Sequence, residues 1–142
     1  MRAILDAGPL IALWGRVDKR RDEHQEWAGK LFGYYTGPFF TTEALLCEVG
    51  FMTGRANEIV EGVAKGHFVI GVSLEHDAAA MARVLKQFPH CDLADSSIVA
   101  LSEKLPSLDV LTTDRRHFLT YRRSDKTRLP LVLPGQEIPS KP

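Results

Sequence analysis

The sequence predicts an α/β fold of three layers, an α/β/α sandwich with a central, mostly parallel sheet. Two observations lead to this prediction. Short apolar and β-branched segments alternate along the chain with longer segments whose apolar residues recur at helical spacing. In addition, the chain has 142 residues, 44% of them hydrophobic and 25% charged, which is typical of one globular domain with its own core.

Five segments are predicted as strands because they are short, rich in apolar or β-branched residues and bounded by turn-forming residues. The first ends at Asp6 and is followed by Ala7-Gly8-Pro9, which breaks the strand. The last contains Pro130, which only an edge strand tolerates because proline has no amide N–H to donate. The five segments are residues 2–5, 39–40, 67–72, 109–111 and 129–133.

The segments between the strands are predicted as helices, and several of their ends carry sequence signals. Thr41 and Thr42 are candidate N-caps for one helix, and Asp92 for another. Gly54 interrupts a helical pattern and Gly66 ends one. The predicted helical segments are residues 7–14, 19–34, 43–53, 55–65, 74–88 and 92–104, with a single turn at 115–118.

Composition excludes several classes of protein. The longest apolar run is far short of the ~20 residues that a membrane helix needs, and the amino end is interpreted as a buried strand rather than a signal peptide. Cys47 and Cys91 show no disulfide spacing, so we expect reduced thiols, a cytoplasmic location and no membrane partner. Residues 1–133 are expected to form the domain, and the proline-rich residues 134–142 a flexible tail.

The charges balance, with 18 basic and 18 acidic residues, which argues against a general nucleic-acid coating protein. The basic residues are nevertheless clustered. Residues 111–128 hold six of them against two acids, and a second cluster consists of Arg16, Lys19, Arg20 and Arg21. Solvated loops and a rim that contacts phosphates explain clusters of this size equally well.

Four carboxylates point to a metal site. Asp6 and Asp114 follow predicted strands, so they belong to the sheet edge where ligands bind in open α/β folds. Glu48 and Asp95 lie on otherwise apolar helical segments, where a charge is costly unless it is paired or bound to a metal. A hard cation would relieve the mutual repulsion of such carboxylates, and oxygen ligands favour Mg²⁺ or Mn²⁺.

Each acid also has a purely structural explanation. Asp92 is a standard N-cap, which would put Asp95 in a first turn that the helix dipole favours. Asp114 could cap the turn after it, and Asp6 could close the turn that follows the first strand. No histidine or cysteine spacing indicates zinc, and His117 is interpreted as a surface or phosphate-side residue.

Four stretches together resemble the PIN-domain nucleases, specifically the VapC-type toxins of toxin–antitoxin pairs. They are ILDAGPLIAL, FTTEALLCEVGFM, DLADSSIVALSEKL and VLTTDRRHFLTYR, in family order and at family spacing. The resemblance implies an α/β/α sandwich and a divalent-metal-dependent endoribonuclease that cleaves RNA. It also implies a cognate antitoxin protein and a homodimer. Carried over by motif, the acidic residues are Asp6, Glu48, Asp95 and Asp114, with Asp92 as a secondary position.

The resemblance and the chemistry of phosphodiester hydrolysis together suggest roles for these residues. Asp6 and Asp95 would bind the principal metal and Asp114 would complete the cluster. Glu48 would bind metal or position the attacking water, with Asp92 as a further candidate ligand. Thr112 or Thr113 would orient Asp114 or a metal-bound water. The predicted contacts with substrate come from Arg115, Arg116 and Thr113.

The sequence leaves alternatives open. A housekeeping PIN-type RNA-processing nuclease would share all four acids. A degenerate PIN domain would bind RNA without cleaving it. A receiver-type α/β module is a non-catalytic rival, but it would need an aspartate after a middle strand, and the third predicted strand ends without an acid. The apolar residues Leu45, Leu46, Phe51, Val60 and Val63 could serve an antitoxin contact or the protein's own core.

Overall fold

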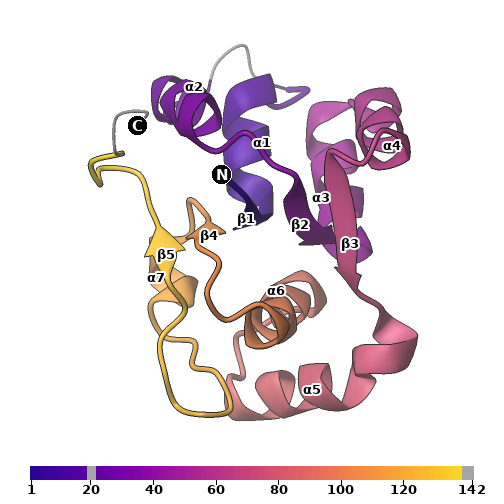
Figure 1. Cartoon of the computed structure of the whole chain (residues 1–142), viewed down its shortest axis with the longest axis vertical. Coiled ribbons are helices and arrows are strands. Elements are labelled where there is room, and N and C mark those ends of the chain that lie inside the picture. Colours follow the sequence, from indigo (N-terminus) through magenta and orange to yellow (C-terminus); the bar gives the residue numbers. More distant parts are fainter. Residues whose placement is uncertain (19–21, 139–142) are drawn as a thin grey trace.

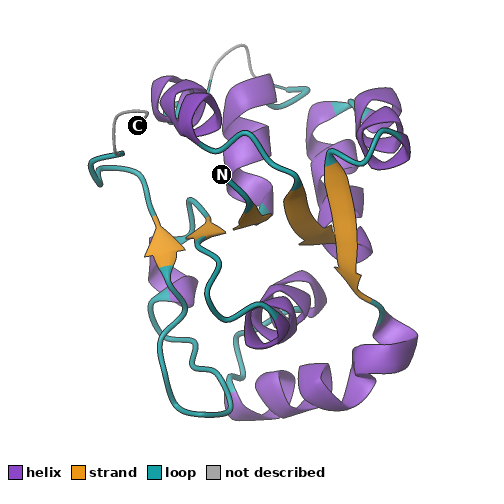
Figure 2. Cartoon of the chain, viewed as in Figure 1, coloured by secondary structure: helices purple, strands orange, loops and turns teal. Residues whose placement is uncertain are grey.

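A single parallel sheet organises the structure (Figures 1 and 2). The computed structural model describes residues 1–18 and 22–138, and within them five strands pair in the order β3-β2-β1-β4-β5, every pair parallel. The predicted α/β class and parallel sheet are therefore confirmed. The strands are β1 (Ala3–Leu5), β2 (Phe39–Thr42), β3 (Phe68–Val72), β4 (Val110–Leu111) and β5 (Leu131–Val132).

Helices cover both faces of this sheet (Figure 1). Helices α1 to α4 lie on one face, and α5 and α6 lie on the other, which makes the three-layer sandwich. The central strand β1 is fully buried, as expected for a parallel strand covered on both faces. The helices are α1 (Ala7–Trp14), α2 (Gln25–Tyr34), α3 (Glu43–Thr53), α4 (Ala56–Ala64), α5 (Leu74–Gln87), α6 (Leu93–Lys104) and the short α7 (Arg115–Phe118).

The strand order locates the ligand-binding edge. The chain runs outward from β1 to β3 with helices on one face, then crosses to β4 on the other side of β1 with helices on the opposite face. The direction of winding therefore reverses between β1 and β4, and ligands in open α/β sheets bind at such a point. Receiver-type domains have the order 2-1-3-4-5, so this topology does not support the receiver alternative.

Most element boundaries agree with the prediction to within one residue, but those of α2, β2 and β5 differ by more. Helix α2 begins at Gln25 rather than Lys19, because Asp22 accepts a hydrogen bond of 2.8 Å from the backbone N–H of His24 and forms a turn there. Lys19 itself, with Arg20 and Arg21, lies outside the described residues. Strand β2 continues to Thr42, which caps α3 as predicted.

Thr41 is not an N-cap, contrary to the sequence-based expectation. It lies within β2, and its hydroxyl donates a hydrogen bond of 2.9 Å to the carbonyl of Leu5 in β1. Strand β5 is shorter than predicted and begins after Pro130, whose carbonyl accepts a bond from Val110. At the carboxyl end, Ile138 packs against the core. Within the described residues, no helix combines the length and apolar character needed to cross a membrane.

Close packing of α4 on β3 gives a test of the fold. A β-carbon added at Gly62 would lie 2.7 Å from the ring of Phe68, which is itself buried. We expect Gly62→Ala to lower the free energy of unfolding by roughly 1–3 kcal/mol through overpacking. The matched control is Gly29→Ala in α2, where a β-carbon meets nothing within 4 Å. It should raise stability by about 0.5–1 kcal/mol through lower backbone entropy of the unfolded chain.

Urea denaturation of the two variants beside the wild type measures both effects. A Gly62→Ala protein as stable as Gly29→Ala would contradict the packing of α4 against β3.

Candidate functional site

A cleft of about 400 Å³ opens at the carboxyl ends of β1 and β4, the point where the winding of the sheet reverses. All four predicted acids line it, although they come from four separate elements of the chain. The predicted residues that line the cleft are Asp6, Glu48, Asp92, Asp95, Thr113 and Asp114. The structure therefore brings together the carboxylates that the sequence places up to about a hundred residues apart.

Asp6 forms the floor of the cleft, and Thr112 holds it. Asp6 directly follows β1 and is only 7% exposed. The hydroxyl of Thr112 donates a hydrogen bond of 2.6 Å to Asp6 Oδ2 and accepts one of 3.0 Å from the backbone N–H of Asp114. Burial raises the pKa of Asp6 to about 7, and the nearby Asp95 and Glu48 carboxylates act in the same direction. Thr112 thus orients the carboxylate of Asp6 and bonds only to the backbone of Asp114, whose orientation by Thr112 or Thr113 was the prediction.

Thr113 faces a different neighbour. A β-carbon added at Gly8, in the first turn of α1, would overlap the side chain of Thr113 at 1.9 Å from Oγ1. Thr113 therefore packs directly over the start of α1, and only glycine fits beneath it. This contact keeps the loop after β4 close to the end of β1, so that Asp114 and Asp6 share one cleft.

Asp114 pairs with His117. One carboxylate oxygen of Asp114 accepts a bond of 3.0 Å from the backbone N–H of His117 and caps α7, as the structural interpretation predicted. The other oxygen lies 3.0 Å from His117 Nδ1. His117 therefore lines the cleft, and its side chain is 40% exposed. Potential ligand atoms of Asp95, Asp114 and His117 all lie within 4.8 Å of one another.

Asp95 lies in the first turn of α6 behind the N-cap Asp92, whose side chain accepts a hydrogen bond of 2.8 Å from the Asp95 backbone N–H. The Tyr121 hydroxyl donates a bond of 2.6 Å to Asp95 Oδ2. Burial raises the pKa of Asp95 to about 6, against the opposing effect of this bond, and the charges of Asp92 and Asp114 raise it further. The predicted cap Asp92 and the candidate site acid Asp95 therefore lie at the same first turn of α6.

Glu48 lies at the mouth of the cleft. Its α3 neighbours Leu45 and Val49 are fully buried, but Glu48 itself is exposed, which the apolar segment around it did not predict. The cleft walls still remove enough water to raise the pKa of its carboxyl group, and Asp92 adds to this effect. Glu48 is thus the member of the set with the freest access to solvent.

Arginine and histidine side chains lie beside the acids of the cleft, together with one further acid, Asp22. Arg16, His24 and His90 line the cleft beside the carboxylates. Of the two predicted substrate-binding arginines, Arg115 donates a hydrogen bond of 2.9 Å to the carbonyl of Pro134. Arg116 lines an adjoining hollow of about 440 Å³ that shares His90 and His117 with the cleft. The two arginines therefore have different surroundings.

The donor atoms fit a divalent cation. Two carboxylates and one imidazole within 4.8 Å of one another offer enough ligands for a first coordination shell, and Asp6 lies on the same cleft. The sequence indicated an oxygen-only site suited to Mg²⁺ or Mn²⁺. The imidazole of His117 adds a nitrogen donor to this set.

The predicted site residues do not include two residues that contact the acids of the cleft, His117 and Tyr121. His117 lies three residues after Asp114 in a predicted helical turn, and that spacing puts the two side chains on one face. This spacing could therefore have identified His117 as a neighbour of Asp114. Tyr121 is separated from Asp95 by 26 residues, and no local pattern indicates their contact.

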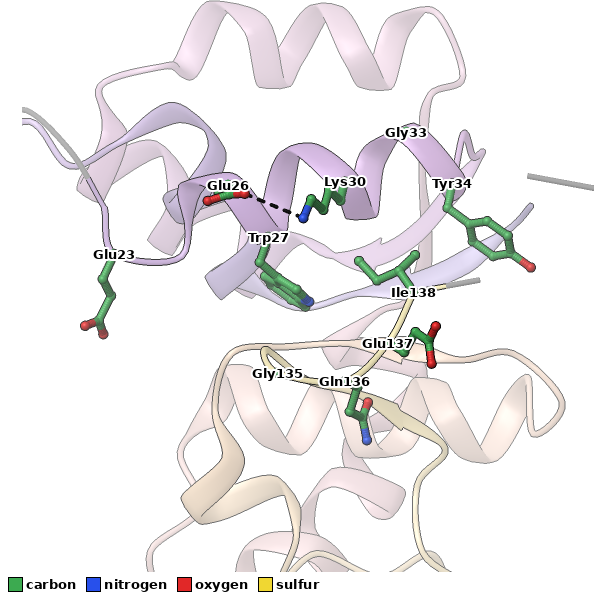
Figure 3. Close-up of a pocket in the computed structure, with 10 residues that line it drawn as sticks. All are labelled: Glu23, Glu26, Trp27, Lys30, Gly33, Tyr34, Gly135, Gln136, Glu137 and Ile138. Carbon is green, nitrogen blue, oxygen red and sulfur yellow. Dashed lines mark ion pairs between the residues drawn. The ribbon is translucent and has the colours of Figure 1, made fainter. Parts of the chain in front are cut away.

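A larger hollow lies elsewhere and lacks this chemistry. Residues of α2 and of the segment after β5 surround about 900 Å³ (Figure 3). Glu26 and Lys30 pair across one turn of α2 at 3.5 Å, and the ring of Trp27 lies on the wall. None of the predicted site residues lines this hollow. The hollow beside α2 is thus the larger of the two, but it lacks clustered acids. The carboxylates with raised pKa values favour the cleft as the functional site.

Comparison with known proteins adds no identification. No family model matches the chain, and a search of curated proteins finds no significant match.

The buried carboxylate of Asp6 gives a prediction about stability. The pKa of Asp6 is about 7 in the folded protein and near 3.8 in the unfolded chain, so its ionisation favours unfolding as the pH rises from about 4 to about 7. Asp6→Asn removes the charge and keeps an oxygen that accepts the Thr112 bond. In EDTA at pH 8 it should raise the free energy of unfolding by about 2–4 kcal/mol, and near pH 4 the gain should vanish.

Asp77→Asn is the control of opposite sign. Lys104 lies 2.7 Å from Asp77 and lowers the pKa of its carboxyl group, so the charge stabilises the fold above pH 4. Its removal should therefore decrease stability over the same pH range. Urea titrations from pH 4 to pH 8 compare the three proteins, and a pH-independent effect of Asp6→Asn would rule out a destabilising buried charge.

Proposed function

We propose that this protein is a divalent-metal-dependent endoribonuclease that acts in the cytoplasm as the toxin of a toxin–antitoxin pair. The observation that carries the proposal is the convergence of four carboxylates into one cleft at the reversal point of the sheet. Burial raises the pKa of Asp6 and of Asp95, so the cluster costs folding stability unless something neutralises it. A cation and a phosphodiester substrate together account for that arrangement.

The residues divide the chemistry between them. Asp95, Asp114 and His117 would hold the cation, with Asp6 on the adjoining wall. A bound divalent cation supplies neutralisation of charge at the scissile phosphate and makes a coordinated water more acidic. We assign to Glu48, an exposed carboxylate of the cleft, the role of accepting a hydrogen bond from the attacking water.

The charge distribution supports a polyanionic substrate. Arg16, His24 and His90 line the cleft beside the acids, and Arg116 lies on the adjoining hollow. Such groups can contact the phosphates on either side of the scissile bond. The choice of RNA, and of a toxin rather than a housekeeping nuclease, rests on the resemblance of the four sequence stretches to VapC-type toxins.

The partner surface that we propose is an apolar groove between α3 and α4. Leu45 and Leu46 belong to the core, whereas Phe51, Val60 and Val63 are 85%, 67% and 39% exposed and line a groove of about 500 Å³. The apolar residues that the sequence left unassigned thus divide into two groups. We assign the exposed group to the antitoxin contact that the resemblance implies. We also propose that the protein forms the homodimer that the resemblance implies.

Cleavage of RNA tests the proposal directly. Wild-type protein freed of any partner should cut a mixture of tRNA and rRNA into discrete products with Mn²⁺ and none with EDTA. Asp95→Asn should lower the rate by roughly 100-fold or more, since it removes a ligand for the cation. The control Glu61→Gln changes an exposed carboxylate of α4 that pairs with Lys65, and it should cleave normally.

Several results would change the assignment. Cleavage that survives EDTA or Asp95→Asn would show that the cleft is not responsible. Discrete products without growth arrest on expression in bacteria would favour a housekeeping nuclease over a toxin. If no products form and Mn²⁺ has no effect on the melting temperature, the acids serve only as helix caps and turn residues.

The two neighbouring arginines give a matched pair of variants. Arg116 lines the hollow that adjoins the cleft, whereas the guanidinium of Arg115 already bonds to Pro134. Arg116→Ala should therefore weaken RNA binding to a catalytically inactive Asp95→Asn protein by about 5–10-fold, the effect of one lost phosphate contact. Arg115→Ala in the same background should change it by less than about twofold. Fluorescence anisotropy at fixed salt measures both, and equal losses would contradict the distinction.

A further inference from the structure

Tyr121 connects the hydrophobic core to the acid cluster, although it belongs to neither predicted set of site residues. It is 1% exposed, and its hydroxyl donates a hydrogen bond of 2.6 Å to Asp95 Oδ2. Its ring makes edge-on contacts with Phe118 and Phe88, with centroids 5.1 and 5.4 Å apart. A hydrophobic anchor of this kind fixes the ring and therefore the direction in which the hydroxyl points.

The backbone around Tyr121 is also held in place. Arg123, two residues further on, donates hydrogen bonds of 2.9 Å to Ser102 Oγ in α6 and 3.0 Å to the carbonyl of Pro106. Arg122 forms a β-bridge with Arg128. The segment that carries Tyr121 is thus tied to α6, the same helix whose first turn presents Asp95. Donor and acceptor are therefore fixed relative to each other by contacts that do not involve their own bond.

The geometry at Asp95 leaves it free to bind a second partner. The Asp92 side chain fixes the Asp95 backbone through the bond at its N–H, and Tyr121 engages one of the two carboxylate oxygens. A carboxylate has about four lone-pair sites on its two oxygens. Asp95 therefore still has lone pairs available on the side where Asp114 and His117 lie. A cation bound there would meet a carboxylate whose orientation is already set.

We propose that Tyr121 is a positioning residue that sets the affinity of the site for divalent cations by orienting the Asp95 carboxylate. The inference rests on the proposed function, because it needs a cation site at Asp95, Asp114 and His117. Hydrogen-bond partners of metal ligands commonly change metal affinity by about 10–100-fold when they are lost. Burial and the neighbouring Asp95 raise the pKa of Tyr121, so its hydroxyl remains a donor throughout the physiological range.

The chain offers a matched control in Tyr35. It is also buried, at 4% exposure, and its hydroxyl donates a bond of 2.7 Å to Asp109 Oδ2. Asp109 precedes β4, so this pair lies at the opposite edge of the sheet from the cleft. Tyr35→Phe and Tyr121→Phe thus remove the same kind of hydrogen bond from the same kind of environment, and only one of them touches the candidate cation site.

Titration of the purified full chain with Mn²⁺, followed by calorimetry or by the spectrum of free Mn²⁺, tests the inference. Tyr121→Phe should raise the Kd for Mn²⁺ by about 10–100-fold, and Tyr35→Phe should leave it within about twofold of wild type. Melting curves without metal establish that both variants fold. In RNA cleavage, excess Mn²⁺ should restore Tyr121→Phe to near the wild-type rate but should not restore Asp95→Asn.

The possible failures are distinguishable. If wild type binds Mn²⁺ and Tyr121→Phe binds it equally well, Tyr121 has only a structural role and the inference is wrong while the proposed function stands. The same holds if both tyrosine variants weaken binding to the same extent. If wild type itself binds no Mn²⁺, the proposed function fails, and the positioning role fails with it.

Discussion

A single buried hydroxyl, that of Thr112, ties together the two halves of the candidate site. It donates to Asp6 at the end of β1 and accepts from the backbone N–H of Asp114 after β4. These two strands are neighbours in space because the chain reverses its winding between them, although more than a hundred residues separate them in the sequence. The hydroxyl thus holds the carboxylate of Asp6 in a fixed position relative to the segment that carries Asp114.

The cleft contains two carboxylates that destabilise the folded protein when they are ionised. Ionised Asp6 and Asp95 are disfavoured by burial, and their pKa values rise accordingly. Hydrogen bonds from Thr112 and Tyr121 offset part of that cost without removing the charge. The same bonds leave oxygens free to accept a cation. Local conflicts of this kind persist in natural proteins chiefly where function needs them, because folding alone would favour apolar residues at these positions.

The sequence predicted the α/β fold and the placement of four acids at one edge of the sheet, because both depend on local patterns. Strand-end position is enough to assign Asp6 and Asp114 to one edge of a parallel sheet, and helical capping is enough to place Asp92 and Asp95 together. Thr41 was misassigned because a threonine before a helix and a threonine ending a strand have the same local sequence, and only the partner strand distinguishes them.

Contacts made across the fold could not be predicted in the same way. Tyr121 approaches Asp95 because Arg123 and the aromatic contacts bring its loop against α6, and none of these interactions leaves a periodic signal. Arg115 and Arg116 are identical in type and adjacent in sequence. Only the path of the segment after β5 gives one of them a carbonyl partner and leaves the other beside the cleft.

The neutral overall charge makes the cation central to how such a site would bind a polyanion. With 18 basic and 18 acidic residues, the protein has no net field to draw in RNA, so attraction must come from local groups. Ionised carboxylates on the floor of the cleft would repel phosphate, whereas the guanidinium of Arg16 on its wall would attract it. One divalent cation carries two positive charges against the four carboxylates of the floor, so it would reduce the negative charge there without reversing it. A cation that binds first would therefore weaken the repulsion that a phosphate meets, and the residues that orient the carboxylates would influence both steps.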